Sequence, residues 1–219
     1  MDTAFIIKFT PMYLEALVLV LKLCFWGSLF SLAIGLFCAL ARYFRVPVLR
    51  QAAALYIELS RNTPLMIQLF FLYFALSRVG LKLDSWTCAL SGLGFLGGSY
   101  MAESFRGGLE AVGRGQIESG LSIGLSRTQL VRYVILPQAL AVCVPSLGAN
   151  VIFLLKETSV VSIVALADLM FVAKDLIGMY YRTNEALLML VLAYLAALMP
   201  LSIALRLIER RLRFAGFGH

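Results

Sequence analysis

Long apolar runs dominate the sequence and constrain the fold more than any other feature. They cover roughly residues 12–41, 52–77, 85–105, 134–155 and 186–207. A helix needs about 20 apolar residues to cross the roughly 30 Å hydrocarbon core of a bilayer, and most of these runs are at least about that long. The sequence therefore predicts an all-α integral membrane protein with about five transmembrane helices.

The composition supports this class of protein. The mean hydropathy is +0.90 and 14% of the residues are charged, whereas about 25% are charged in soluble domains. The 219 residues leave too little polar sequence for a separate soluble domain, so we expect one membrane domain over 1–219. The net charge of +7 is divided among short segments between the runs. Without a continuous basic tract, nucleic acid is not an expected partner.

The cysteines give no sign of a metal or redox site. They lie in apolar stretches without a C-x-x-C pair, and the only histidine is His219. We therefore expect them to be small buried side chains, with no cofactor in this chain. The N-terminal stretch lacks the order of a signal peptide, so the first run is expected to stay in the membrane. The cysteines are Cys24, Cys38, Cys88 and Cys143.

The positions of the arginines predict the topology, because cytoplasmic loops carry an excess of Lys and Arg. An outside N-terminus and five crossings place eleven arginines, together with the segment 106–133 and the C-terminus, in the cytoplasm. The stretch 158–172 is too short to span and predicts a re-entrant or outer-surface helix. Residues 174–185 are expected to form an outer loop. The arginines are Arg42, Arg45, Arg50, Arg106, Arg114, Arg127, Arg132, Arg206, Arg210, Arg211 and Arg213.

One polar stretch interrupts the apolar pattern, "IESGLSIGLSRTQLVRYVILPQAL" at 117–140. Its spacing resembles the EAA loop of permease subunits of ATP-binding-cassette importers. In that loop a Glu-Ala-Ala, a Gly and an Ile-x-Leu-Pro follow one another at the same intervals. Here Ser119-Gly120 replaces Ala-Ala, and Val134 replaces Ile. The residues that the resemblance assigns to ATPase coupling are Glu118, Ser119, Gly120, Gly124, Leu125 and Pro137.

The same stretch also predicts a local structure. We expect a helix over about 115–122, a break at Gly124, and a second helix capped by Ser126. Pro137 is expected to redirect the chain into the fourth span. Such a helical hairpin presents a compact, partly charged surface that a soluble partner can bind.

Further stretches resemble the polar amino-acid branch of these permeases. They are "RNTPLMIQLFFLYFAL" at 61–76, the segment 97–140, and "LLKETSVVSIVALADL" at 154–169. The resemblance implies the transmembrane domain of a type I importer in the bacterial inner membrane. It also implies a second permease subunit, identical or paralogous, and a solute-binding protein that delivers a polar amino acid. An ATPase dimer that binds ATP-Mg would contact the loop at 115–133.

Charged and polar residues within the apolar runs are candidates for a substrate site, because unpaired charges in a bilayer are costly. Glu58 and Arg61 are three residues apart and predict an ion pair near the cytoplasmic end of the second span. Glu103 and Arg106 repeat this spacing and predict the same role.

Glu157 ends the fourth run beside Thr158 and Ser159, where the family has an acidic residue followed by Thr-Ser. Its carboxylate is a candidate to bind a substrate ammonium group. The alternatives are a structural pair with Lys156 and a cap for the following short helix. Asn62, Thr63 and Gln68 are candidates for neutral hydrogen bonds to the substrate, although Gln68 also suits helix packing. The candidate substrate residues are Glu157, Thr158, Ser159, Asn62 and Gln68.

These features are compared with three classes of function: a permease subunit, an ATP-independent carrier or channel, and a membrane scaffold. The chain has neither H-E-x-x-H nor a P-loop, so it is not expected to be an enzyme or to hydrolyse ATP itself. An ATP-independent secondary carrier or channel for small polar solutes is the alternative to the permease, and a membrane scaffold is a third possibility. The absence of an inverted repeat disfavours a carrier, and the loop at 115–133 distinguishes the permease from both. The sequence leaves open which amino acid is carried.

Overall fold

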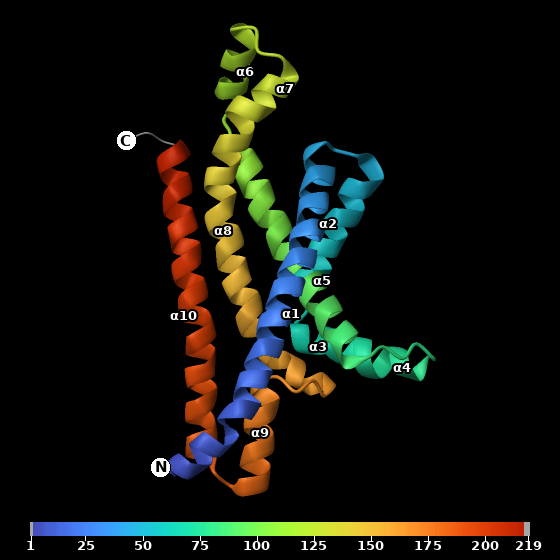
Figure 1. The fold of residues 1–219 in the computed structure, drawn as a ribbon. Helices are drawn as coiled ribbons and strands as arrows, with labels where there is room; N and C mark the ends of the chain where they lie inside the picture. Colours follow the sequence, from blue (N-terminus) through green and yellow to red (C-terminus); the bar gives the residue numbers. More distant parts are fainter. Residues whose placement is uncertain (1, 217–219) are drawn as a thin grey trace.

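The computed structural model describes residues 2–216, with side chains up to Arg211, and the regular elements of this part are helices (Figure 1). His219 and the side chain of Arg213 lie outside the described part. The α-helices are α1 (Thr3–Tyr43), α2 (Pro47–Arg61), α3 (Leu65–Phe70), α4 (Leu76–Arg78), α5 (Ser85–Glu110), α6 (Arg114–Ser122), α7 (Arg127–Leu130), α8 (Leu136–Glu157), α9 (Leu169–Tyr180) and α10 (Thr183–Gly216). Two π turns, η1 (Phe71–Ala75) and η2 (Val131–Ile135), and one 3₁₀ helix, η3 (Thr158–Val164), join some of them.

Within the described residues, three helical stretches are long and apolar enough to cross a membrane, judged by length and composition. They are Thr3–Tyr43, Arg127–Val164 and Thr183–Arg211. At 1.5 Å per residue, α1 is about 61 Å long, so it exceeds the roughly 30 Å core of a bilayer. Helix α5, with 26 residues, is also long enough, about 39 Å. The all-helical membrane fold that the sequence predicts is confirmed.

The second predicted run is broken in the middle, so the prediction of one helix over 52–77 is wrong. Helix α2 ends at Arg61, and α3 begins at Leu65 after Pro64. The residue before a proline is disfavoured in the helical region, so Thr63 is where a helix would end. The second half, Leu65–Arg78, is continuous through η1 and α4, and α4 projects sideways from the other helices in Figure 1.

The helices separate the molecule into two ends, which Figure 1 shows clearly. One end holds the N-terminus, α9 and the start of α10, and we call it the N-terminal end. The other holds α6, α7, the turn between α1 and α2, and the last turns of α10, and we call it the hairpin end. At the N-terminal end, Asp2 joins the start of α1 to the start of α10. Its backbone N–H donates to Glu185 (3.0 Å), and its carboxylate pairs with Arg182 (3.4 Å).

The contact between α1 and α5 is the most extensive one and depends on small residues. A Cβ added to Gly97 would lie 2.2 Å from the Ser31 Oγ and 2.8 Å from a Leu154 methyl group. The Ser31 hydroxyl donates to the carbonyls of Gly27 (2.7 Å) and Leu93 (3.3 Å). Because lipid provides no hydrophobic drive between helices, close packing and such hydrogen bonds hold them together. Small residues at this contact therefore allow α1 and α5 to approach closely.

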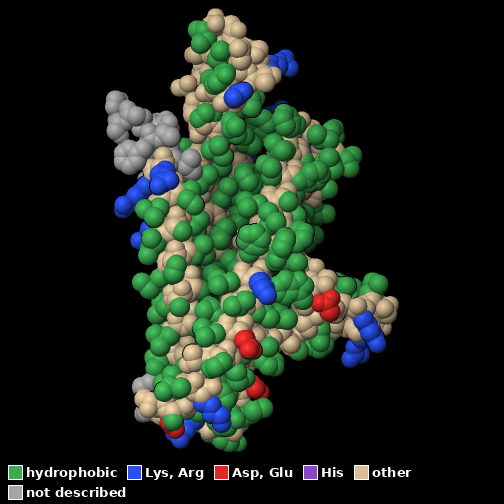
Figure 2. Space-filling view, in the orientation of Figure 1, with side chains coloured by type: hydrophobic (Ala, Val, Ile, Leu, Met, Phe, Trp, Pro, Cys, Tyr) green, Lys and Arg blue, Asp and Glu red, His purple; other side chains and the backbone are tan. Residues whose placement is uncertain are grey.

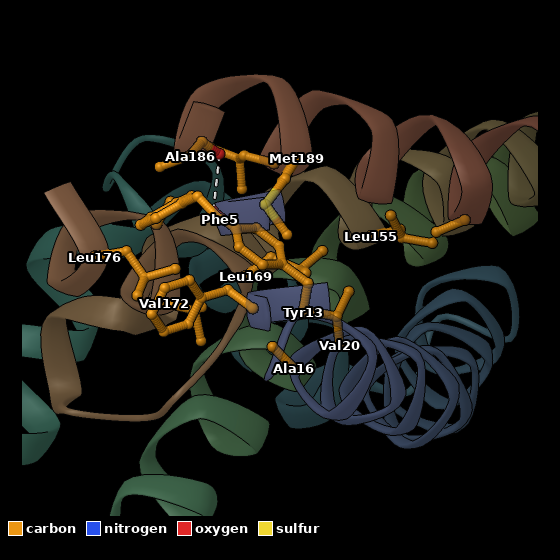
Figure 3. Packing of buried hydrophobic residues seen from close by; sticks show 14 of the residues in the cluster. Phe5, Tyr13, Ala16, Val20, Leu155, Leu169, Val172, Leu176, Ala186 and Met189 are labelled. Carbon is orange, nitrogen blue, oxygen red and sulfur yellow. Dashed lines mark hydrogen bonds between the residues drawn. The ribbon is translucent and has the colours of Figure 1, made fainter. Parts of the chain in front are cut away.

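A large core cluster fixes the N-terminal end. The first half of α1 packs there against α9 and the start of α10 (Figure 3). The Tyr13 hydroxyl donates to the Ala186 carbonyl at 2.8 Å, which is the dashed line in Figure 3. Leu169, Val172 and Leu176 supply the buried face of α9.

Two predictions for this region need correction. Residues 174–185 do not form an outer loop, because α9 continues to Tyr180 and α10 begins at Thr183. The charged residues in this segment indicated a loop, but the apolar face of α9 packs into the core and keeps it helical. The stretch 158–172 is not one helix either. It consists of η3, a short connection, and the first turn of α9, which the buried Asp168 caps by accepting from the Phe171 N–H at 2.9 Å.

The outer surface is mostly hydrophobic along the length of the helices (Figure 2). Basic side chains gather near the upper end of α10 and around the hairpin in this view. The four cysteines are buried and free, as the sequence predicted. The molecule therefore has a lipid-facing middle between two more polar ends.

Candidate functional site

Two helix breaks meet in the middle of the molecule and form the first candidate site. One is the break between α2 and α3, and the other is the change from α8 to η3 at Glu157. Leu65 and Leu69 of α3 share a buried cluster with Val161 and Val164 of η3. Broken helices deep in a membrane protein free backbone groups, and these must be satisfied or must line a cavity.

Side chains satisfy the freed carbonyls at the end of α2. Asn62 donates to the carbonyl of Glu58 (2.8 Å) and to its carboxylate (3.2 Å). The Thr63 hydroxyl donates to the Leu59 carbonyl (2.7 Å). The Gln68 Nε2 donates to the carbonyls of Ser60 (3.2 Å) and Thr63 (3.0 Å). The donors of these three side chains therefore stabilise the break itself, and the buried Gln68 Oε1 is left without a partner in the described part.

Thr158 and Ser159, which follow Glu157, differ in whether their hydroxyls are already hydrogen-bonded within the protein. Thr158 is fully buried, and its hydroxyl donates to the Leu155 carbonyl at 2.7 Å. Ser159 is half-buried, and its side chain makes no hydrogen bond within the described residues. The buried Tyr194 hydroxyl of α10 lies next to both, but no hydrogen bond of good geometry satisfies it within the part described. This site therefore holds polar atoms that are not used by the protein itself.

Glu157 is half-buried, and its carboxylate has neither a hydrogen bond nor an ion pair among the residues that the structure describes. The pair with Lys156 is absent there, because neighbouring residues on a helix point about 100° apart and Lys156 is exposed. The carboxylate does not cap η3 either. Neither structural alternative accounts for Glu157, and burying an uncompensated carboxylate is costly.

Arg61 contacts the first of two packed aromatic rings, and the second ring belongs to α8, the helix that ends at Glu157. Its guanidinium carbon is 5.1 Å from the centre of the Tyr100 ring. That ring is 5.1 Å from the ring of Phe153, which is one helical turn before Glu157 on α8. Arg61 is therefore held by a cation–π contact.

The predicted pair of Arg61 with Glu58 is wrong. Among the described residues, the Glu58 carboxylate accepts from Asn62 and forms no ion pair. Both residues lie in the last turn of α2, away from its start at Pro47, and the side of the membrane that this end faces stays a prediction. The predicted pair of Glu103 and Arg106 is confirmed at 2.6 Å.

The hairpin at 114–130 forms the second candidate site, and its turn is fully hydrogen-bonded. After α6, the N–H of Leu125 donates to the Gly120 carbonyl (3.1 Å), and the N–H of Gly124 donates to the Leu121 carbonyl (3.0 Å). This is a Schellman motif, which requires a left-handed residue after the helix. Gly124 supplies it with φ +82°. The sequence prediction of a helix ending before Gly124 is confirmed.

Capping then begins α7, as predicted. Ser126 and Gln129 form a capping box, in which the Gln129 side chain accepts from the Ser126 N–H at 2.9 Å. Gly120 is buried against α7, since a Cβ there would lie 2.5 Å from a Leu130 methyl group. Gly120, Gly124 and Leu125 therefore build the hairpin.

The outer side of the hairpin presents Glu118 and Ser119, which are both exposed. The Glu118 carboxylate has no partner in the described chain. Ile123 at the tip is 79% exposed. Leu121, on the last turn of α6, is 50% exposed as well, so this end of the hairpin presents apolar side chains beside polar ones.

The comparisons with known proteins decide the family. The family model described as "Binding-protein-dependent transport system inner membrane component" matches residues 31–214. The chain belongs to this family. The permease is 36% identical over 196 residues to the probable amino-acid ABC transporter permease protein PatM of Vibrio harveyi, over 88% of each chain. It is 34% identical over 205 residues to the glutamine transport system permease protein GlnP of Escherichia coli (strain K12), over 93% of this chain and 94% of that one.

Solved structures support the same fold. A crystal structure of an amino acid ABC transporter with histidines matches with a TM-score of 0.89 at 34% identity, over 96% of this chain and 99% of that one. An inward-facing structure of the MetNI methionine ABC transporter matches with a TM-score of 0.72 at 20% identity, over 97% and 99%. The second likeness concerns the fold alone. The predicted type I importer fold of the permease is confirmed, and the matches favour a permease over a secondary carrier or channel.

Pro137, which the sequence predicted to redirect the chain of the permease, does not end a helix. It lies inside a continuous helical stretch, Arg127–Val164. A proline lacks the N–H for the helical hydrogen bond, and its ring clashes with the preceding turn. The π turn η2 directly before α8 widens the helix at this point and accommodates the proline without a break in the helix.

Sequence reasoning missed two features of the permease. Ile123 was one apolar residue within a short polar loop, and only its exposure shows that it forms the tip of the hairpin. The contact of Arg61 with Tyr100 joins α2 to α5, and no local spacing indicates it. A signal was available for the α2–α3 break, because Pro64 follows two polar residues inside an apolar run.

Proposed function

We propose that this permease forms, with a second permease subunit, the pathway of an ATP-driven importer for a polar amino acid. A solute-binding protein delivers the substrate, and a separate ATPase dimer that binds ATP-Mg drives the cycle. The names of PatM and GlnP support an amino-acid substrate. The observation that carries the proposal is the hairpin at 114–130, which is rigidly capped and exposes Glu118 and Ile123.

The ATPase contacts the permease through this hairpin. Ile123 enters an apolar pocket of the ATPase, and the free Glu118 carboxylate pairs with a basic side chain at the edge of that pocket. A buried apolar anchor with a polar rim is the usual arrangement of a protein interface. The Schellman motif and the capping box support this role, because they let the hairpin transmit force as one body.

The hairpin end faces the cytoplasm, and the N-terminal end faces outward. The loops and helix ends at the hairpin end carry the ten described arginines of the sequence-based prediction. Positive residues concentrate on the cytoplasmic side of membrane proteins. With this orientation, the ATPase meets the hairpin from inside the cell, and the binding protein docks at the end that holds α9.

The substrate passes the two helix breaks. Glu157 binds the ammonium group of the amino acid, and Ser159 supplies a neutral hydrogen bond. Arg61, held over the Tyr100 ring, receives the substrate carboxylate. Asn62, Thr158 and Gln68 contribute by shaping the breaks, because their donors are already bonded to backbone carbonyls or to Glu58. Opposite charges on two elements suit a zwitterion.

The experiment is reconstitution of the permease with its ATPase and binding protein in liposomes. We expect uptake of a polar amino acid that requires ATP on the ATPase side and the loaded binding protein outside. ATPase activity should rise when the loaded binding protein is added. Liposomes without the binding protein are the control. Uptake that continues without ATP would support the secondary carrier and contradict the proposal.

A further inference from the structure

A basic cavity opens at the hairpin end, away from the helix breaks and next to the hairpin, whose Arg114 and Ile117 help to line it. Its volume is about 460 Å³, and it lies between the end of α1, the turn to α2, and the connection from α5 to α6. Its charged lining consists of Arg42, Arg45, Arg50, Arg106, Arg114 and Glu110.

The ion pairs inside this cavity leave most of its positive charge uncompensated. Glu103 binds both Arg42 and Arg106, each at 2.6 Å, and Arg106 also binds Glu110 at 2.5 Å. Five arginines therefore stand against two glutamates, a surplus of three. Three exposed arginines have no partner within the described residues, and they are Arg45, Arg50 and Arg114. Such a cavity attracts an anion, because a guanidinium donates in a fork that matches a phosphate.

An apolar groove adjoins the basic cavity. It has a volume of about 630 Å³ and runs between α1, α5 and the stretch from α6 to α8. The two hollows share three lining residues, Tyr43, Leu109 and Ile117. Leucines of α1 and α8 form much of the groove, and they are Leu36, Leu40, Leu136 and Leu140. A ligand that fills both hollows has an anionic head and an apolar chain.

The surroundings place this pair of hollows at the membrane surface. Phe44 is 69% exposed and Val48 is 77% exposed beside the basic cavity. Aromatic and apolar side chains next to arginines are typical of the boundary between headgroups and acyl chains. This step rests on the membrane orientation in the proposed function, in which the hairpin end faces the cytoplasm.

We propose that the permease binds one anionic phospholipid here, with its phosphate among the arginines of the cavity and an acyl chain in the groove. A free phosphate would leave the groove empty, and an acidic protein segment would need polar partners there. Basic pockets between transmembrane helices on the cytoplasmic side are suited to such headgroups. The lipid would tie the turn after α1 to the start of the hairpin.

The test measures lipid binding to the purified complex of permease and ATPase by native mass spectrometry. Phosphatidylglycerol and phosphatidylcholine with the same acyl chains are titrated separately. We expect phosphatidylglycerol to bind more tightly. In the double variant Arg45→Gln/Arg50→Gln it should bind about 30-fold more weakly, because each arginine near a lipid surface contributes about 1 kcal/mol. These two arginines have no partner in the described chain, so their replacement leaves no orphan charge.

Arg211→Gln is the matched control, because Arg211 lies at the same end and does not line the cavity. Leu140→Gln, in the groove, should also weaken phosphatidylglycerol binding. Inorganic phosphate at millimolar concentration should not displace the lipid. Equal binding of the two lipids, unchanged binding in the double variant, or displacement by phosphate would overturn the proposal. Loss of the ATPase from the double variant, with lipid binding unchanged, would instead assign the cavity to an acidic segment of the ATPase. Since neither substrate nor transport enters this measurement, a failure of the proposed function would be seen separately.

Discussion

Glu157 is the candidate substrate residue whose surroundings the protein itself explains least. Its half-buried carboxylate lies where α8 ends and is without a partner in the described part of the chain. Removing a charge from water without compensation is costly. A substrate ammonium group would supply the missing partner on binding. The free-energy cost of the unpaired carboxylate would then apply only to the site without substrate.

The first prediction is that Glu157→Gln strongly reduces uptake, while the complex still assembles and keeps its basal ATPase activity. A charge-assisted hydrogen bond contributes about 1.5–3 kcal/mol, so the affinity of the transmembrane site should fall roughly 10- to 150-fold. Uptake is measured at matched expression. Lys156→Gln is the control, because this neighbour is exposed, and it should transport normally. Undiminished uptake by Glu157→Gln would remove Glu157 from the substrate site.

Gln68 leads to the opposite expectation, since its Nε2 is bonded to two backbone carbonyls. We predict that Gln68→Leu lowers the stability of the protein by about 1–3 kcal/mol, because acceptors at the α2–α3 break lose their donor. The midpoint of thermal unfolding in detergent should fall, whereas the substrate affinity of the folded fraction should change little. An unchanged midpoint together with a loss of affinity would assign Gln68 to the substrate instead.

At the scale of elements, the hairpin shows how a short motif determines a local structure. Its Schellman motif and capping box were predictable from Gly124 and Ser126, because both are local hydrogen-bond patterns. The α9 segment was not predictable in this way. Its charges indicated a loop, and its helix depends on burial of Leu169, Val172 and Leu176 against α1 and α10. The contact of Arg61 with the Tyr100 ring likewise depends on packing between elements far apart in the chain.

We predict that either Glu118→Lys or Gly124→Leu leaves the permease in the membrane but uncouples it from ATP hydrolysis. The first reverses the charge on the exposed face of the hairpin. The second puts a side chain at φ +82°, where a left-handed conformation costs about 1–2 kcal/mol. ATPase activity stimulated by the loaded binding protein is the measurement. Thr128→Ala, at an exposed position on α7, is the control. Normal stimulation in both variants would show that the hairpin is not the coupling element.

At the scale of the whole molecule, the distribution of charge and the helix layout agree with the proposed orientation. The turn after α1, the hairpin and the end of α10 are far apart in the sequence, yet they lie at one end of the molecule (Figure 1) and carry arginines. Most of the long helices could be predicted because apolar length is a property of the sequence alone, but the second of the five predicted spans is divided into α2 and the stretch Leu65–Arg78. The break at Asn62–Pro64 could have been predicted from Pro64 and the polar residues before it, but a hydropathy average over the long apolar run does not reveal it.

The last prediction tests this orientation with single cysteines in a background that lacks the four native ones. Ser119→Cys in the hairpin and Asn184→Cys at the start of α10 are both at exposed positions, so a difference in labelling reports the side of the membrane and not burial. We expect an impermeant maleimide to label residue 184 in intact cells, and residue 119 only after the membrane is opened. The ten described arginines at the hairpin end favour this result, because moving them outward would oppose the positive-inside bias. Labelling of residue 119 from outside would refute the orientation, and with it the placement of the ATPase at the hairpin.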